Sequence, residues 1–369
     1  MLIMASRSIV RRVTESKFGF RLFAFPALII TCLLTCGILR ADTNIVWSDE
    51  FNGTSLDTTK WTFDTGNGFY AGNYWVSGWG NNELENYTSR TNNVYVAGGC
   101  LHIRAQQESY GGQNYTSGRI KTKGLFSKKY GRIEFRAKLP AGTGFWPAFW
   151  LMPDHSPYGG WPNCGEIDVM ENKGNIPTQV GGTIHYGGAG GYDVYSGKTY
   201  YFSGGNSATN FHVYTLEWTT NSIKWLVDGQ LYETRNTWWS NIGTSSSKYP
   251  YPAPFDQPFY ILMNLAIGGN YLGNPSQDLI NASLPGEVQV DYVRVYDETP
   301  PLVISTATLP NGNLTLSWPT NIACRLQMLT NPSALANGTG WVDVPSASDP
   351  YIVSPDANDG SVFYRLVSP

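Results

Sequence analysis

Charged side chains are scarce in this sequence: Asp, Glu, Lys and Arg make up only 14% of its 369 residues. Beyond the N-terminal segment there is no run of basic residues, and residues 42–369 carry a net charge of −8 from 19 basic and 27 acidic side chains. An acidic surface repels a phosphate backbone, so we expect no nucleic acid partner. Low charge together with 41% hydrophobic residues also excludes a disordered chain.

Cysteines are few, and their spacing shows no pattern. Of the five, Cys32 and Cys36 lie in the N-terminal segment, which leaves Cys100, Cys164 and Cys324. Three cysteines without paired spacings define neither a disulfide framework nor a zinc site. A single bridge between Cys100 and Cys164 stays open, because spacing alone does not decide it.

Long apolar runs are also missing, except for one near the N-terminus. It extends from Leu22 to about Leu34, follows several basic residues and precedes the small residue Ala41. This order predicts a signal peptide over residues 1–41, and therefore a protein that is secreted or lies at the cell surface or in the periplasm. The run is short for a stable membrane span and contains Pro26. The sequence before Cys36 loosely resembles a lipoprotein cleavage site, which leaves a lipid anchor as the alternative.

The rest of the chain is rich in the residues of short strands and tight turns, with 14% aromatic residues and 40 glycines. Apolar and polar residues alternate over 132–139, the pattern of a half-buried strand. Asp228-Gly229 separates two strand-like runs and predicts a hairpin, and a long strand is expected over 288–296. Because no amphipathic helix interrupts these strands, we expect an all-β fold, an antiparallel β-sandwich of jelly-roll type, over residues 42–297.

A change of composition marks the end of this domain. Residues 298–301 include two prolines and are expected to form a linker. Beyond it, residues 302–369 contain short strand-like pieces at 314–318 and 361–367, separated by Asn, Pro, Ser and Gly. We expect a second, small β-sandwich-like domain there. Core packing is the favoured role for its Trp318 and Trp341, with glycan contact as the alternative.

Three acidic residues crowd one predicted strand, Glu166-Ile167-Asp168-Val169-Met170-Glu171. Side chains two residues apart share a strand face, so Glu166 and Asp168 point the same way, whereas Glu171 would point to the other face. A single β-bulge would bring all three acids onto one surface. Cleavage of a glycosidic bond with retained configuration needs two carboxyl groups about 5–5.5 Å apart. Such a row is alternatively a solvated strand face without function, but crowded like charges cost stability.

The acidic strand resembles the active-site signature of glycoside hydrolase family 16, in its bulged, laminarinase-like version. Other segments resemble that family in the same order along nearly all of residues 45–297. They are the segments 47–53, 78–84 (Gly-Trp-Gly-Asn-Asn-Glu-Leu), 117–122, 145–150 (Phe-Trp-Pro-Ala-Phe-Trp), 264–270 and 290–296.

The resemblance implies roles for single residues. Glu166 would be the nucleophile, Glu171 the acid/base, and Asp168 would assist them, raising the pKa of the acid by its charge. Substrate would be bound by Asn81, Arg119, Trp146, Trp150 and His185. From the residues alone, Trp150 fits a core position equally well, Arg119 could pair with a surface acid, and an isolated histidine is usually structural.

The resemblance also implies a structural Ca²⁺ site away from the cleft. The matching positions are the carboxylates of Glu50 and Asp291 and a backbone carbonyl near Gly99, and hard oxygen ligands suit this ion. The turn at 97–99 lacks the Asp-Gly pair common in the family, so the carbonyl ligand has less support. No cofactor is expected for the chemistry itself.

Taken together, these features predict a secreted, retaining endo-β-1,3-glucanase that acts on laminarin-type glucan as a monomer. Substrate choice depends on loops, so other polymers such as mixed-linkage β-glucan, agarose or porphyran remain alternatives. A transglycosylase and a non-catalytic glucan-binding protein are the other two, although such binding proteins usually lack the catalytic carboxylates.

Overall fold

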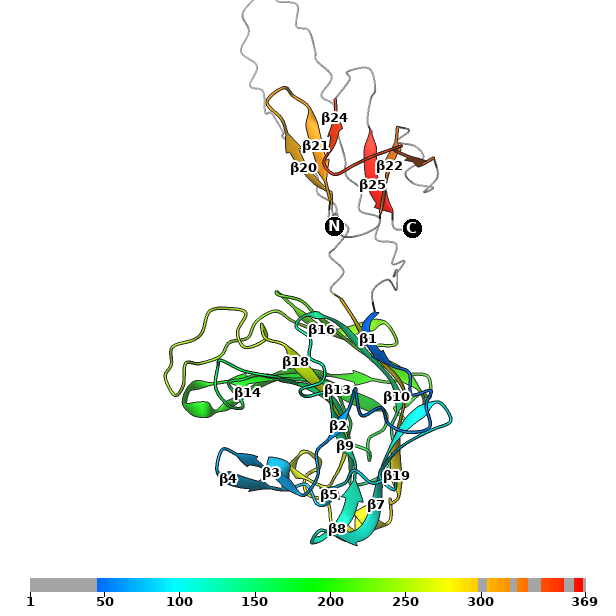
Figure 1. Ribbon diagram of the computed structural model, residues 1–369, viewed down its shortest axis with the longest axis vertical. Helices are drawn as coiled ribbons and strands as arrows, with labels where there is room; N and C mark the ends of the chain where they lie inside the picture. The colour runs from blue at the N-terminus through cyan, green and yellow to red at the C-terminus, as the bar shows by residue number, and fades with distance from the viewer. Residues whose placement is uncertain (1–44, 298–303, 319–323, 331–339, 355–361, 368–369) are drawn as a thin grey trace, which may run out of the picture. The chain divides into compact units, whose positions relative to one another are not determined.

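The computed structural model describes residues 45–297, 304–318, 324–330, 340–354 and 362–367; the predicted signal peptide and linker lie outside these ranges. The chain divides into two compact units. Thr43–Glu298 forms the larger, and the strands after residue 304 belong to the other. Almost all regular structure is β (Figure 1). No helix in the described part of the chain has the length and apolar composition needed to cross a membrane.

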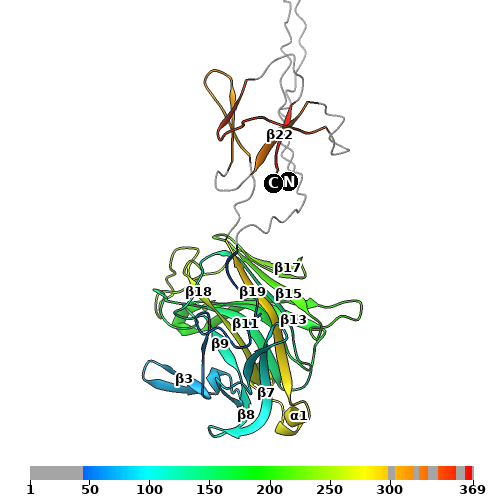
Figure 2. The same ribbon diagram turned by 45° about the vertical axis from the view of Figure 1, so that its right-hand side comes forward.

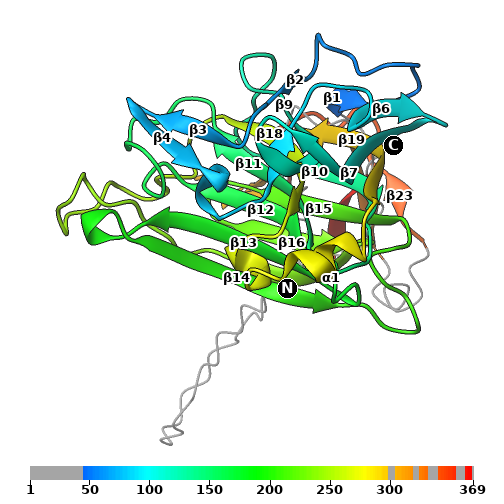
Figure 3. The same cartoon turned by 90° about the horizontal axis from the view of Figure 1, so that it is seen from below.

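The larger unit contains a seven-stranded sheet that carries the acidic strand. Four of its seven strands, β11 to β14, lie side by side in Figure 3, with β12 between β11 and β13. All of its strand pairs are antiparallel. In spatial order the strands are β14 (Asp193–Tyr201), β13 (Gln179–Gly187), β12 (Glu166–Glu171), β11 (Phe145–Pro153), β18 (Phe259–Ile267), β9 (Arg119–Lys121) and β2 (Thr62–Phe63).

A ten-stranded sheet forms the second layer. Its strands pair antiparallel except for β5 with β8. In spatial order they are β17 (Gln230–Arg235), β16 (Ile223–Val227), β15 (His212–Trp218), β10 (Gly131–Lys138), β19 (Gly286–Tyr296), β7 (Cys100–Tyr110), β8 (Gln113–Ser117) and β5 (Glu85–Tyr87), with β1 (Ile45–Asp49) on β19 and β6 (Val94–Ala97) on β7.

The core lies between the two sheets. Phe135 of β10 and Phe149 of β11 are fully buried and stack with ring centroids 5.0 Å apart. Strand β18 is buried along its whole length, next to the middle strand β11 of the seven-stranded sheet. Truncating a buried phenylalanine to alanine costs about 3–5 kcal/mol, so such pairs fix the sheets against one another.

The predicted all-β sandwich is confirmed, and so is the hairpin at Asp228-Gly229. Both turn residues have positive φ, 50° and 77°, as the tight turn between β16 and β17 requires. Helical pieces are short: α1 (Gln277–Asn281), near the end of β7 in Figure 2, and the 3₁₀ turns η1 (Gly78–Gly80), η2 (Ala189–Gly191) and η3 (Asn270–Leu272). A separate hairpin of β3 (Gly68–Ala71) and β4 (Tyr74–Ser77) precedes η1.

The second unit has two small antiparallel sheets. One contains β20 (Ser305–Thr308), β21 (Leu314–Ser317) and β24 (Tyr351–Val353), and the other β23 (Val342–Asp343), β22 (Arg325–Leu329) and β25 (Phe363–Val367). Trp318 packs against their common core, and Arg365 lies 4.3 Å above the ring of Trp341. The contact of Trp318 supports its packing role, whereas Trp341 is not among the residues packed against this core and its role stays a prediction.

Cys100, Cys164 and Cys324 are all free thiols in the structure. The bridge between Cys100 and Cys164 that spacing left open does not form. The reason is their placement, since Cys100 begins β7 in one sheet and Cys164 precedes β12 in the other.

Candidate active site

Strand β12 contains the β-bulge that its acidic residues require. Against β13, Asp168 lies opposite Thr183 and Glu171 opposite Gly181, so three steps on β12 match two on β13. The pairing with β11 has the same irregularity, between Phe149 and its neighbour Trp150. The bulge restores the phase of Glu171. Glu166, Asp168 and Glu171 therefore share one face of the sheet, with Ile167 and Met170 buried beneath.

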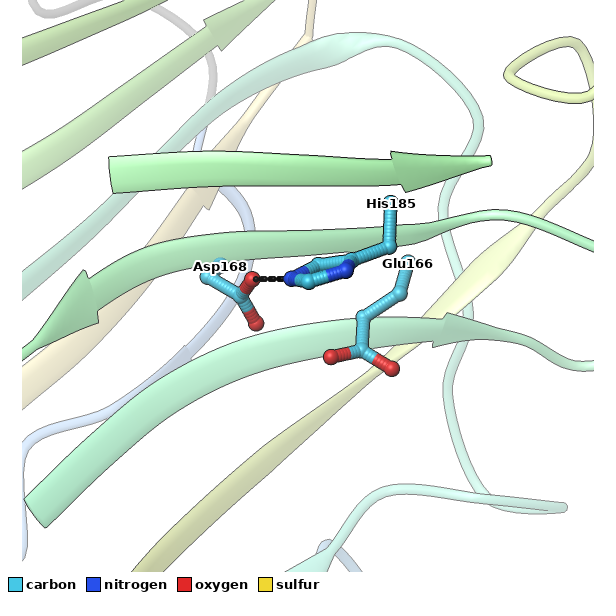
Figure 4. A group of neighbouring side chains, drawn as sticks. All are labelled: Glu166, Asp168 and His185. Atoms are coloured by element: carbon cyan, nitrogen blue, oxygen red, sulfur yellow. Dashed lines mark ion pairs between the residues drawn. The ribbon is translucent and has the colours of Figure 1, made fainter. Parts of the chain in front are cut away.

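His185 on β13 completes this row. It lies opposite Glu166 in the strand pairing, and its Nε2 is 3.3 Å from Oδ2 of Asp168 (Figure 4). On its other side, Nδ1 is 2.9 Å from Oδ2 of Asp193 on β14. The imidazole is thus held between two carboxylates, and its ring faces the same surface as the three acids.

Burial and mutual repulsion hold protons on this row. Burial raises the pKa of Glu166 well above its ordinary value and Asp168 raises it further, whereas His185 opposes the shift. Burial and Asp168 also raise the pKa of Glu171, to about 8. Burial alone would lower the pKa of His185, but Asp168 and Glu166 raise it to about 11. At neutral pH the site therefore combines an imidazolium with a carboxyl group at Glu171 that keeps its proton.

Glu166, Asp168 and His185 are also the one group of candidate metal ligands among the described residues. Their ligand atoms lie within 4.8 Å of one another. A metal needs a neutral imidazole, however, and both ring nitrogens of His185 already face carboxylates. The arrangement favours an ion-pair network over a metal site.

Trp146 contacts the last acid of the row directly. Its indole Nε1 donates a hydrogen bond of 3.0 Å to Oε1 of Glu171. On its other side the ring stacks on Tyr271 with centroids 4.9 Å apart. Tyr271 belongs to η3 and was not identified from the sequence, since no residue pattern distinguishes it there. The pair fixes the Glu171 carboxyl and forms one apolar wall beside it.

Arg119 lies between two tryptophan rings. Its guanidinium carbon is 4.4 Å from the Trp79 ring and 4.8 Å from the Trp150 ring, and its Nε donates to Asp64 at 3.0 Å. Cation–π contacts of a guanidinium fix its plane. Arg119 does pair with an acid, Asp64, but that ion pair is not its sole contact, because it also lies against the two rings.

A chain of hydrogen bonds leads from Trp150 to the loop of Asn81. Trp150 Nε1 donates to Asn264 Oδ1 at 2.8 Å, and Asn264 Nδ2 donates to the hydroxyl of Tyr87 at 3.1 Å. That hydroxyl donates to Glu83 Oε2 at 3.0 Å. Asn81, which is exposed, donates from Nδ2 to Glu83 Oε1 at 3.3 Å.

This chain explains Trp150 and adds residues that the sequence did not identify. Trp150 is half-buried and lies opposite Asp168 in the strand pairing, so it is packed and also points to the sheet face that carries the acids. Tyr87 and Asn264 are buried between it and Glu83. They hold Trp150 and Asn81 in fixed positions relative to the acidic row.

The residues implied for calcium are occupied differently. Glu50 accepts two hydrogen bonds from Arg294, at 2.9 and 2.8 Å, and Asp291 accepts one from Arg136 at 2.5 Å. Gly99 follows β6 in the turn before β7. A calcium ion would have to displace both guanidinium groups, so the donor set does not fit the ion as it stands. Calcium binding there stays a prediction.

Two carboxyl groups on one β-sheet face, flanked by indole rings, can divide the work of cleaving an acetal: one protonates the leaving oxygen and the other, once ionised, attacks the acetal carbon. This fold and site define a glycoside hydrolase. The sequence model of Glycosyl hydrolases family 16 matches residues 64–294, and the chain belongs to this family.

Individual relatives agree with this assignment. The chain is 47% identical over 270 residues to "Glucan endo-1,3-beta-glucosidase A1" of Niallia circulans. This match covers 70% of this chain but only 38% of that protein. It is 40% identical to "Beta-glucanase" of Rhodothermus marinus, covering 73% of this chain and 93% of that one. The crystal structure of the laminarinase from Rhodothermus marinus superposes with a TM-score of 0.58 at 41% identity, over 69% of this chain and 97% of the other.

Proposed function

We propose that this protein is a secreted endo-β-1,3-glucanase that hydrolyses laminarin-type glucan with retained configuration. The observation that carries the proposal is the bulge of β12. It gives one sheet face two glutamates, Glu166 and Glu171, that flank Asp168. The names of the relatives, which include glucan endo-1,3-β-glucosidases and a laminarinase, support the choice of substrate.

In the first step, Glu171 donates its proton to the glycosidic oxygen while the Glu166 carboxylate attacks the anomeric carbon. The bond to the leaving sugar breaks, and a glycosyl ester of Glu166 forms. The proton comes from a carboxyl group whose pKa is raised to about 8, so it is present at neutral pH. Glu166 attacks as its carboxylate, having released its proton to solvent before this step; the imidazolium of His185 favours that ionised form, against burial and Asp168, which disfavour it.

In the second step, Glu171 accepts a proton from water, and the water oxygen attacks the anomeric carbon from the face that the leaving sugar vacated. The ester bond breaks, Glu166 regains its negative charge, and Glu171 is protonated again. Asp168 stabilises His185 through their ion pair. Two inversions at one carbon leave the product with the configuration of the substrate. Sugar could replace water at this step, which would give transglycosylation.

Binding of the sugar chain is assigned to the residues that surround the row. Trp146 and Trp150 offer indole rings against the flat C–H faces of pyranose rings, and Asn81, Arg119 and His185 offer hydrogen bonds to hydroxyl groups. Trp146 and Trp150 belong to β11, next to β12, and His185 to β13 on the other side. This placement supports a cleft that runs across the strands.

Incubation with laminarin, lichenan, agarose and porphyran, followed by product sizing and NMR of the fresh products, tests the proposal. We expect laminarin to be cut internally to short oligosaccharides that first appear as the β-anomer. Cleavage of a galactan without cleavage of laminarin would contradict the substrate, and an α-anomer would contradict the mechanism. Sequencing the N-terminus of the exported protein tests removal of residues 1–41, and light scattering tests the expected monomer.

A further inference from the structure

The β3–β4 hairpin exposes four large aromatic side chains that no part of the proposed mechanism uses. The relative exposures are 41% for Phe69, 70% for Tyr70, 73% for Tyr74 and 40% for Trp75. Leaving so many rings in water on one short hairpin is costly unless something covers them. In Figure 1 this hairpin and β14 both extend to the left of the unit.

The two faces of the hairpin differ in what holds them. Tyr70 lies directly opposite Trp75, so both point to one face, and their rings meet edge to face at 5.0 Å. A Cβ added at Gly68 would come within 2.9 Å of Trp75, so this ring also covers the hairpin's own backbone. The aromatic pair of the Tyr70–Trp75 face therefore helps to hold the hairpin itself together.

The opposite face leads toward the acidic row. Phe69 stacks on Trp79 with centroids 6.1 Å apart, Trp79 lies against Arg119, and Arg119 lies against Trp150. Tyr74 points to this face too, because alternate residues share a face and its partner Ala71 is two positions from Phe69. Its ring lies beyond Phe69, toward the tip of the hairpin. The Phe69–Tyr74 face thus continues a row of planar groups that begins opposite Asp168.

The distance along this row sets which substrates could reach the hairpin. In the sheet, β11, β18 and β9 separate β12 from β2, and the hairpin begins five residues after β2 ends. Four strand spacings of about 4.8 Å amount to about 19 Å, the length of several sugar units. A short oligosaccharide bound at Glu166 would end before the hairpin, whereas a polymer chain would extend over it.

We propose that the Phe69–Tyr74 face of the β3–β4 hairpin is a remote binding site for the same glucan chain that is cleaved at β12. Its occupant is a sugar residue several units from the scissile bond, bound by ring stacking. The site makes the enzyme selective for long chains, because it adds affinity only when the substrate spans the row from Trp150 to Tyr74. This inference depends on the proposed function, which supplies the polymer.

The test compares Tyr74→Ala with Tyr70→Ala, its matched control on the other face of the same hairpin. Both rings are largely exposed, so neither substitution removes a core residue, and equal melting temperatures would check this. We expect Tyr74→Ala to raise KM for laminarin about three- to tenfold, the loss of one aromatic contact. Its KM for a β-1,3-linked trisaccharide and its kcat on both substrates should stay at the wild-type value.

Tyr70→Ala should leave KM for laminarin unchanged. Binding of laminarin should show the same difference: Tyr74→Ala should weaken it and Tyr70→Ala should not. Each change is combined with the inactivating Glu166→Gln for this measurement, so that the polymer stays intact. A wild-type KM for laminarin in Tyr74→Ala would overturn the inference, and an equal rise in both variants would overturn the choice of face. Failure of the proposed function is distinguishable, because it would show in the wild-type protein as no cleavage of laminarin.

Discussion

Two pairs of acidic side chains, Glu50 and Glu108 near the ten-stranded sheet and Glu166 and Glu171 on β12, have pKa values shifted in opposite directions. On the ten-stranded sheet, hydrogen bonds from Arg90 lower the pKa of Glu108 to about 2, and Arg294 lowers that of Glu50. On the seven-stranded sheet, burial and Asp168 raise the pKa of Glu166 and Glu171. The difference lies first in burial, which disfavours the carboxylates of β12, and then in the partners, since a fixed guanidinium stabilises a carboxylate and a neighbouring carboxylate destabilises it.

This contrast shows where the chain keeps protons available for chemistry. An acid held by arginine is ionised at every physiological pH and can only contribute structure. The pKa of the buried Glu171, about 8, lies near the pH at which proton transfer is useful, at a cost in folding stability. The larger the difference in pKa between the two pairs of acids, the more clearly their variants should differ. Five experiments follow, beginning with the largest expected effect.

The largest effect is expected at the two glutamates of β12. Glu166→Gln should lower kcat on laminarin by a factor on the order of 10⁴ or more, because an amide forms no glycosyl ester. Glu171→Gln should lower it about 10²–10⁴-fold, because the leaving sugar loses its acid. Glu108→Gln is the control and should keep the wild-type kcat.

Azide separates the two roles when an activated aryl glycoside is the substrate. In Glu171→Gln the intermediate still forms, and azide attacks it to give a β-glycosyl azide. In Glu166→Gln azide displaces the leaving group directly and gives the α-product. If the two products are exchanged, the roles assigned to the glutamates are reversed.

The pH profile should show the raised pKa of Glu171. The acid must be protonated for the first step, so kcat/KM on laminarin should fall about tenfold for each pH unit above its pKa of about 8. Glu171→Gln, measured with an activated aryl glycoside, should lack this alkaline limb. If kcat/KM of the variant still falls at alkaline pH, a group other than Glu171 causes the fall.

Stability should depend on pH in opposite directions for the two sets. The native pKa of Glu108, about 2, lies below its unfolded value, so its contribution is present above about pH 4.3 and is lost as pH falls through 2. The side chain is partly exposed, so Glu108→Gln should cost only about 1 kcal/mol at neutral pH.

Glu171 has the reverse sign, because its native pKa lies above the unfolded value. The wild-type protein should lose stability as pH rises from about 4.3 to 8, and Glu171→Gln should remove this part of the loss. Urea unfolding at several pH values measures both. Parallel curves for the wild-type protein and Glu171→Gln would show that the carboxyl group ionises as easily as in the unfolded chain.

The smallest effect is expected for calcium at Glu50 and Asp291. An ion bound only to the native state stabilises it, so chelation should lower the melting temperature. Because the ion must displace Arg294 and Arg136, we expect a loss below about 1 kcal/mol, or at most a few degrees. Activity well below the melting temperature should not change. An unchanged melting temperature in metal-free protein would exclude the site.

The sequence predicted those parts of the molecule that follow from local patterns. Alternation over 132–139 and the Asp228-Gly229 turn identify strands and a hairpin, because side-chain phase and turn geometry are local. The bulge in β12 was predictable from the odd spacing of its acids. Other contacts join residues more than a hundred positions apart. They are the stacking of Trp146 on Tyr271 and the hydrogen bonds from Trp150 through Asn264 to Tyr87. No single-sequence pattern contains such pairings.

The hairpin of β3 and β4 was missed for another reason. By composition its aromatic residues look like ordinary core residues, and only their exposure in the structure distinguishes them. Likewise, the positions implied for calcium matched by residue type, but the sequence could not show that arginines already neutralise them.

The bulge also makes the acidic strand unusually tolerant of losing one residue. Elsewhere in a sheet, deleting a residue turns every following side chain to the opposite face. If Val169 or Met170 were deleted, Glu166 and the glutamate that is now Glu171 would lie four positions apart, and a regular strand without a bulge would carry both on one face. Two spacings between the catalytic glutamates, five positions with a bulge and four positions without one, thus place both acids on the same face. The site therefore tolerates the loss of one residue between the two side chains whose positions the chemistry fixes.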